Sequence, residues 1–167
     1  MYSVTKMDDY VDNLYQNIGI LRTDDLKMDI ISERLGIELR FFQHGCQTII
    51  HQGKKYIFID ERLSKEIQWQ RYTHELCHAL WHYGNQSNMV NTNFHTFMAY
   101  QEVKAEYFSL TACMPAFLIR QLDLSKDPNL LQAEVQELFH VTKYYAEKRL
   151  MKLREKLLYN NELRKLS

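Results

Sequence analysis

The stretch His74-Glu75-Leu76-Cys77-His78 places two imidazoles four residues apart, with a glutamate directly after the first. On an α-helix, four residues rise by about 6 Å and are offset by only about 40°, so both rings can reach one ion. The pattern is typical of a Zn2+ site in which the glutamate stands beside the ion without binding it. Glu75 is then placed to take a proton from a zinc-bound water, so the motif predicts a metal-dependent hydrolase.

This chemistry requires the motif to lie on a helix, and the surrounding sequence predicts one. Ser64 is a suitable N-cap, and Glu66 falls in the first turn. No Gly or Pro interrupts the run that follows until Gly84, which is a natural C-cap. We therefore expect both imidazoles on one face of a helix that extends to about residue 83.

A catalytic zinc takes three protein ligands and keeps one position for water, so a third ligand must come from elsewhere. His82 continues the spacing of four, but eight residues place it about 12 Å from His74, too far to share the ion. The metzincin pattern needs Gly and His where this chain has Trp81 and Gly84. That class is excluded.

Glu102 is the better candidate for the third ligand. It lies two dozen residues downstream of the motif in a segment of helical character, with Glu106 one turn later on the same face. Glu102 can bind the ion directly, while Glu106 accepts the spare ring N–H of a ligand histidine. Without the upstream motif, we would interpret Glu102 and Glu106 as acidic residues on a solvent-exposed edge of the helix.

The HExxH motif, the later Glu102-x-x-Ala105 with Phe108, and Met114-Pro115 together resemble the ImmA/IrrE family of metallopeptidases. The similarity extends more loosely over most of the chain, because the expected helices and strands occur in the order that the family shows. The resemblance implies a gluzincin-like zinc peptidase.

By position, the family's zinc ligands correspond to His74, His78 and Glu102. The resemblance implies that Glu75 is the catalytic glutamate. Two positions depart from the family pattern: Cys77 replaces the glycine usual before the second histidine, and Glu106 stands where Asn or Asp is more common. The Cys77 thiol is an alternative ligand, but His78 has the better spacing with the first histidine.

The sequence predicts an α+β fold. Residues 37–42, 48–51 and 56–60 have strand character, and turn signals separate them. We expect residues 1–118 to form a zincin-like core in which this small sheet packs on the HExxH helix. Residues 119–167 are expected to form a helical C-terminal subdomain packed on the core.

Length and composition agree with one compact enzyme. The 167 residues are 46% apolar and 13% aromatic, which is enough to bury one core and argues against disorder. Three cysteines at unpatterned spacings read as reduced thiols. No apolar run is long enough for a signal peptide or a membrane span, so we expect a cytoplasmic protein with no membrane partner.

The chain has no net charge, but the segment from residue 141 onward carries eight basic and three acidic residues. Such a segment can dock nucleic acid or an acidic protein segment. A solvated helix that packs through one apolar side is the favoured interpretation. The apolar positions that would form that side are Tyr145, Leu150, Leu153 and Leu157.

The other histidines are expected to be surface or packing residues, with His82 near the end of the motif helix. One further group should donate a hydrogen bond to the oxyanion that forms during attack on a peptide. The sequence does not choose among the candidates for that donor, which are His44, His51, His95 and Tyr107.

We therefore predict a zinc-dependent endopeptidase. The family resemblance implies a narrow protein substrate, namely a helix-turn-helix repressor encoded by a phage or integrative element. One alternative is a non-proteolytic transcriptional regulator that keeps the zincin scaffold and binds DNA or a repressor. Another is a metallopeptidase-like toxin. Nucleic acid is a less favoured partner than a protein substrate.

Overall fold

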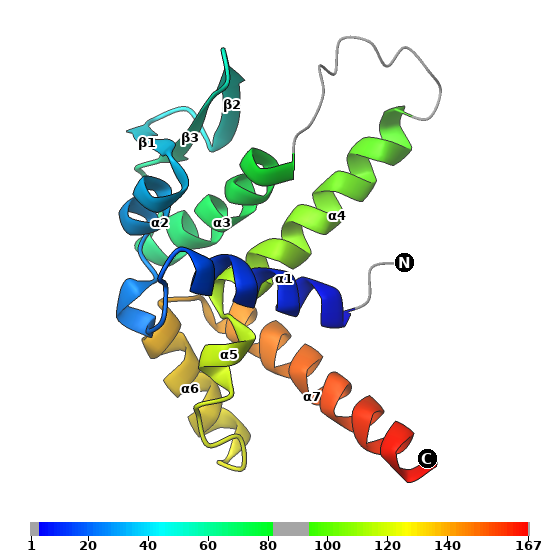
Figure 1. Cartoon of the computed structure of the whole chain (residues 1–167). Coiled ribbons are helices and arrows are strands. Elements are labelled where there is room, and N and C mark those ends of the chain that lie inside the picture. The colour runs from blue at the N-terminus through cyan, green and yellow to red at the C-terminus, as the bar shows by residue number, and fades with distance from the viewer. Residues whose placement is uncertain (1–3, 82–93, 167) are drawn as a thin grey trace.

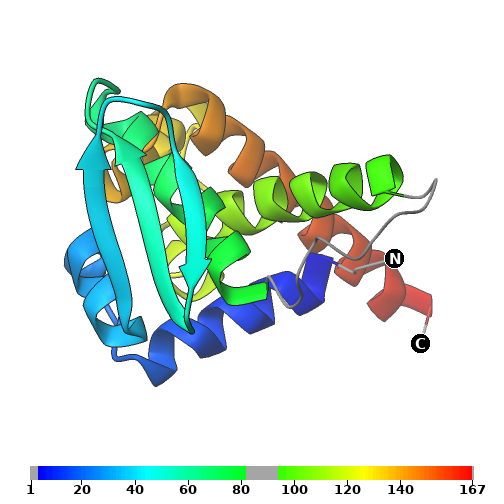
Figure 2. The same ribbon diagram turned by 90° about the horizontal axis from the view of Figure 1, so that it is seen from above.

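The computed structural model describes the backbone of residues 4–81 and 94–166 and the side chains of residues 6–81 and 98–155. A small sheet lies against one side of α3, and α4 packs on the other side (Figures 1 and 2). The expected α+β fold is thus confirmed. Its elements are α1 (Val4–Asn17), the 3-10 helix η1 (Thr23–Asp25), α2 (Met28–Leu35), β1 (Ile37–Phe42), β2 (Gln47–His51), β3 (Lys54–Asp60), α3 (Lys65–Trp81), α4 (Phe94–Cys113), α5 (Ala116–Ile119), α6 (Pro128–Phe139) and α7 (Lys143–Leu166).

The sheet has the strand order β1-β3-β2, with β1 parallel and β2 antiparallel to the central strand β3. The turn between β2 and β3 consists of Gln52 and Gly53, whose φ angles are 49° and 77°. Two consecutive positive φ angles are typical of the two-residue hairpin turns that match the twist of the strands. This turn fixes the register of β2, so that Thr48 lies opposite Ile57.

The helix that carries the HExxH motif forms as predicted. Ser64 Oγ accepts a hydrogen bond from the backbone N–H of Ile67 across 3.4 Å, which satisfies one of the free donors at the start of α3. Tyr72 and Leu76 are fully buried where α3 packs within the core. The expected C-cap Gly84, His82 and the polar segment 85–93 lie outside the described residues.

One hydrophobic cluster includes buried residues on both sides of residue 118, from Met7 on α1 to Leu153 on α7. Tyr145, Leu150 and Leu153 are buried, as the favoured interpretation of the basic tail requires. Arg149 is fully buried. The sequence did not suggest this burial, because a charged residue of a basic helix is expected at the surface. The division at residue 118 stays a prediction.

Thr23 to Asp25 form a short 3-10 helix, and α2 begins at Met28. Helix α4 begins eight residues before Glu102, and α5 ends at Ile119. Within the described ranges, no helix combines the length and the apolar character that crossing a bilayer requires.

Candidate metal centre

The two histidines of the motif face the same side of α3. The Nε2 atoms of His74 and His78 lie 3.2 Å apart, and the ring planes meet at 69°. His74 is 9% exposed, and the His78 side chain is 12% exposed. The rings are therefore held inside the protein with their Nε2 atoms directed at one point, which is the arrangement that the spacing of four residues predicted.

Glu102 brings its carboxylate to this point from α4. Its Oε2 lies 3.2 Å from His74 Nε2, and its Oε1 lies 3.3 Å from His78 Nε2. The structure thus brings together the three residues that the sequence suggested, although they come from two helices. The Glu102 side chain is 54% exposed, so the group borders solvent.

The three side chains fit a divalent cation. Tetrahedral zinc with bonds of about 2.0–2.1 Å to nitrogen and oxygen separates its ligand atoms by about 3.3 Å. The observed separations of 3.2, 3.2 and 3.3 Å match this value. Two imidazoles and one carboxylate are also a donor set of catalytic zinc sites, in which three protein ligands leave one position open. The group formed by His74, His78 and Glu102 can therefore hold a metal ion.

Glu106 lies beside His74, next to the ring nitrogen Nδ1 that points away from the metal group. Its Oε2 is 3.9 Å from His74 Nδ1, which is longer than a hydrogen bond. That Nδ1 is buried and has no hydrogen-bond partner among the described residues. The distance is short enough for a small rotation of the exposed Glu106 side chain to close it, so the expected contact stays a prediction.

Glu75 is 8% exposed and meets β2. Its Oε2 accepts a hydrogen bond of 2.9 Å from Thr48 Oγ1, and the same hydroxyl lies 2.8 Å from the backbone oxygen of Glu75. Burial raises the pKa of Glu75, and the Thr48 hydrogen bond and the neighbouring His74 act in the opposite direction. Thr48 is a site residue that the sequence did not reveal, because it is 27 residues away from Glu75.

A cavity of about 130 Å³ adjoins the metal group. It is lined by residues of α3, α4 and α7, which are Ile67, Gln70, Arg71, His74, Glu106 and Tyr145. Arg71 places a cation at this rim of the site, close enough to help lower the pKa of Glu75. The cavity is large enough for a few water molecules or one small side chain.

Cys77 does not join the group. The described His, Cys, Asp and Glu residues that converge tightly enough to hold a metal are His74, His78 and Glu102. The Cys77 side chain is 3% exposed, and burial raises the pKa of its thiol to about 12. The thiolate is the form that binds metals, and burial disfavours it at this position.

The described candidates for the oxyanion donor, His44, His51 and Tyr107, make their recorded contacts away from the metal group. His44 packs edge-on against Phe42, and His51 lies at the end of β2 beside the hairpin turn. Tyr107 packs toward α7, where Lys152 Nζ lies 5.1 Å from the centre of its ring, and burial, followed by the Asp8 carboxylate, raises its pKa to about 12. The side chain of His95 lies outside the described residues.

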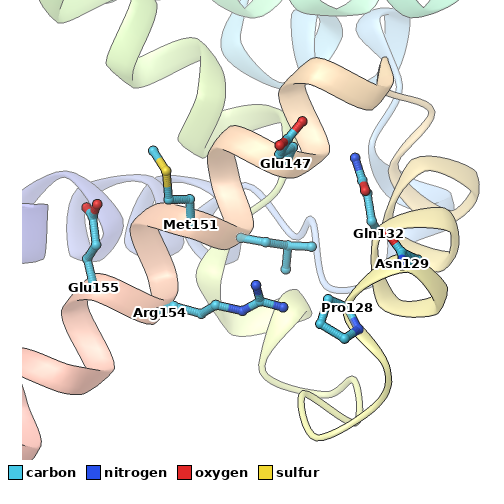
Figure 3. Close-up of a pocket in the computed structure, with 8 residues that line it drawn as sticks. Pro128, Asn129, Gln132, Glu147, Met151, Arg154 and Glu155 are labelled. Atoms are coloured by element: carbon cyan, nitrogen blue, oxygen red, sulfur yellow. The ribbon is translucent and has the colours of Figure 1, made fainter.

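Two larger cavities lie away from the group. The first cavity, of about 370 Å³, lies between α6 and α7. Figure 3 shows the Arg154 side chain extending from α7 toward Pro128 at the start of α6. Another, of about 430 Å³, is bordered by Phe41, Trp69 and His140. Neither is lined by a residue of the metal group, so cavity size does not identify the site.

Comparison with known proteins agrees with the geometry. The model of a peptidase family described as the IrrE N-terminal-like domain matches residues 24–151, which include the sheet, α3 and α4. The chain belongs to this family. The resemblance seen in the sequence is thus confirmed, and peptidases of the IrrE N-terminal-like family act on proteins or peptides.

Two relatives of this IrrE-like peptidase come from Bacillus subtilis (strain 168). The phage-like element PBSX protein XkdA is 33% identical over 147 residues, which cover 88% of this chain and 72% of XkdA. The uncharacterized protein YqaB is 30% identical over 149 residues, which cover 89% of this chain and 84% of YqaB. The first relative is by its name a protein of a phage-like element.

Proposed function

We propose that this protein is a zinc-dependent endopeptidase that cleaves a specific protein, a helix-turn-helix repressor of a phage or integrative element. The observation that carries the proposal is the convergence of His74, His78 and Glu102 beside Glu75. The peptidase family of the chain and the phage-like element of the XkdA relative support it.

His74 Nε2, His78 Nε2 and a carboxylate oxygen of Glu102 would hold the zinc ion. Bound zinc supplies Lewis acidity, which polarises a peptide carbonyl and makes water acidic enough to be deprotonated at neutral pH. Glu75 takes a proton from the attacking water and later gives it to the leaving amine nitrogen. Burial favours this exchange of protons, because it raises the pKa of Glu75 toward neutral pH.

Strand β2 is the element that we assign to substrate binding. It forms an edge of the sheet, and its Thr48 contacts Glu75. An extended peptide can add to such an edge through backbone hydrogen bonds, which hold side chains of different kinds. Ile49 and Ile50 are 41% and 42% exposed on this strand and are available for apolar contacts with the substrate.

The test uses purified full-length protein loaded with zinc and the helix-turn-helix repressor encoded beside its gene. We expect mass spectrometry to find one major cut in the repressor, and Glu75→Gln to keep its zinc and abolish the cut. Cleavage by Glu75→Gln at the wild-type rate would remove the general-base assignment. An intact repressor after incubation with zinc-loaded wild type would contradict the proposed substrate.

A regulator that binds DNA through the basic tail is the competing function. It receives less support, because one of the eight basic residues of that tail, Arg149, is fully buried. Salt-sensitive DNA binding that survives removal of the metal would favour this alternative over proteolysis.

A further inference from the structure

Thr48 is the residue of strand β2 whose hydroxyl is hydrogen-bonded to the motif helix. Gln47, Ile49, Ile50 and His51 are exposed, and Thr48 alone within this strand is half-buried. The register of the sheet places Thr48 beside Ile57 of β3, which in turn lies beside Leu39 of β1. Thr48 thus occupies the end of an apolar row.

A threonine at such a position differs from the isosteric valine by one hydroxyl. A half-buried hydroxyl without a partner costs free energy, so the row alone would favour valine. The hydroxyl of Thr48 has its partners on α3, where its Oγ1 lies 2.9 Å from Glu75 Oε2 and 2.8 Å from the Glu75 backbone oxygen. Both partners belong to the residue that we propose as the general base.

We infer that Thr48 is a positioning residue that holds the carboxylate of Glu75 for proton transfer. The inference rests on the proposed function, because it assigns Thr48 a role through the general base. Thr48 shares its one hydroxyl proton between Oε2 and the backbone oxygen of Glu75, and this leaves Oε1 of Glu75 to receive the proton from water. The glutamate side chain has three rotatable bonds, and the hydrogen bond from a rigid strand restricts them.

The proton balance of this role is simple. One proton moves from the attacking water to Glu75 Oε1 and then from Oε1 to the leaving amine nitrogen. Thr48 keeps its own proton throughout and shares it between Oε2 and the backbone oxygen of Glu75 in both steps. A residue that supports a reacting group in this way affects turnover by about 10- to 100-fold when it is removed.

The experiment compares three full-length variants, Thr48→Val, Thr48→Ser and Thr111→Val. Thr48→Val removes the hydroxyl and keeps the shape, whereas Thr48→Ser keeps the hydroxyl. Thr111→Val makes the same chemical change at a buried hydroxyl that donates to Tyr107 O within α4. It controls for a general loss of stability, which thermal unfolding measures for each variant.

The first readout is kinetic and uses a fluorogenic peptide that spans the bond cut in the repressor. We expect kcat of Thr48→Val to fall about 10- to 100-fold with KM nearly unchanged, because the hydroxyl holds the base and not the substrate. Thr48→Ser and Thr111→Val should keep kcat within about threefold of wild type. An unchanged kcat in Thr48→Val, with normal cleavage by wild type and none by Glu75→Gln, would overturn the positioning role alone.

The second readout does not depend on activity. Crystal structures of the metal-free variants should show the Glu75 carboxylate displaced or in several rotamers in Thr48→Val, and held as in wild type in Thr48→Ser. A Glu75 side chain that keeps one conformation without the hydroxyl would overturn the inference, even if the rate falls. A wild-type protein that cuts neither the repressor nor the peptide would instead contradict the proposed function.

Discussion

Arg149 Nη2 on α7 donates a hydrogen bond of 2.7 Å to Asp8 Oδ1 on α1, and neither side chain is exposed. Arg149 Nε also donates to the backbone oxygen of Met114 across 2.9 Å. One buried guanidinium therefore connects the first helix, the residue that directly follows α4 and the last helix. This arrangement fixes the C-terminal region to the part of the chain that carries the metal group.

Removing the charge of Asp8 should destabilise the protein. Asp8→Asn leaves the Arg149 guanidinium buried without its counter-charge, and breaking a buried pair in this way typically costs about 3–5 kcal/mol. Urea unfolding of wild type and variant measures the difference. The double change Asp8→Leu with Arg149→Met should recover part of the loss, because it removes both charges. A loss below about 1 kcal/mol in Asp8→Asn would show that the pair is not a major source of stability.

Glu106→Gln should weaken zinc binding without unfolding the protein. Glu106 Oε2 lies 3.9 Å from the buried Nδ1 of His74, and a carboxylate there orients a ligand histidine and raises its basicity. Loss of such a partner lowers metal affinity by about 10- to 100-fold. Competition with a chelator measures the affinity. Glu134→Gln is the matched control, because Glu134 is an acid on α6 that pairs with Lys126 away from the metal group. Equal affinities in the two variants would exclude a role of Glu106 at the site.

Cys77 should be inert toward both metal and alkylating reagents. Its thiol is buried, and its pKa is raised to about 12. We expect Cys77→Ala to change zinc affinity by less than about threefold, whereas His78→Ala lowers it by more than about 100-fold. Mass spectrometry should find Cys77 unmodified after iodoacetamide treatment of the folded protein at pH 8. Rapid alkylation, or zinc loss in Cys77→Ala, would favour the thiol as a ligand.

Asp60 should make stability depend on pH. The hydrogen bonds from the Arg62 guanidinium lower the pKa of Asp60 far below its usual range, and the backbone N–H groups of Arg62 and Gly45 add to this effect. A group whose pKa is lowered in the folded state stabilises it above its unfolded pKa of about 3.9, and this contribution is lost as the pH falls toward the folded pKa. Asp60→Asn should therefore unfold at lower urea concentration than wild type at pH 7, and the gap should narrow below about pH 4. A gap that does not change with pH would contradict this origin.

The sequence predicted the local parts of the site well. The spacing of His74 and His78 on a helix without Gly or Pro determines where their rings point, and the periodicity of α3 is a short-range property. Glu102 could be found because its segment is helical and because the motif lacks a third ligand. Its distance from the imidazoles could not be predicted from the spacing, since it depends on how α4 packs against α3.

The contacts that depend on sheet register and on distant helices could not be predicted. Thr48 reaches Glu75 because the Gln52-Gly53 turn fixes which residues of β2 face α3. The pairing of Arg149 with Asp8 joins residues 141 positions apart, and the sequence alone reads this arginine as one more surface charge. Such contacts appear only when the tertiary packing is known.

The most direct test of the metal centre is anomalous diffraction from crystals of the full-length protein soaked in zinc. We predict one strong zinc peak, with bonds of about 2.0–2.2 Å to His74 Nε2, His78 Nε2 and a carboxylate oxygen of Glu102. The peak should disappear in His78→Ala and persist in Glu75→Gln. Zinc bound elsewhere on the protein, with no peak between these three side chains, would contradict the account.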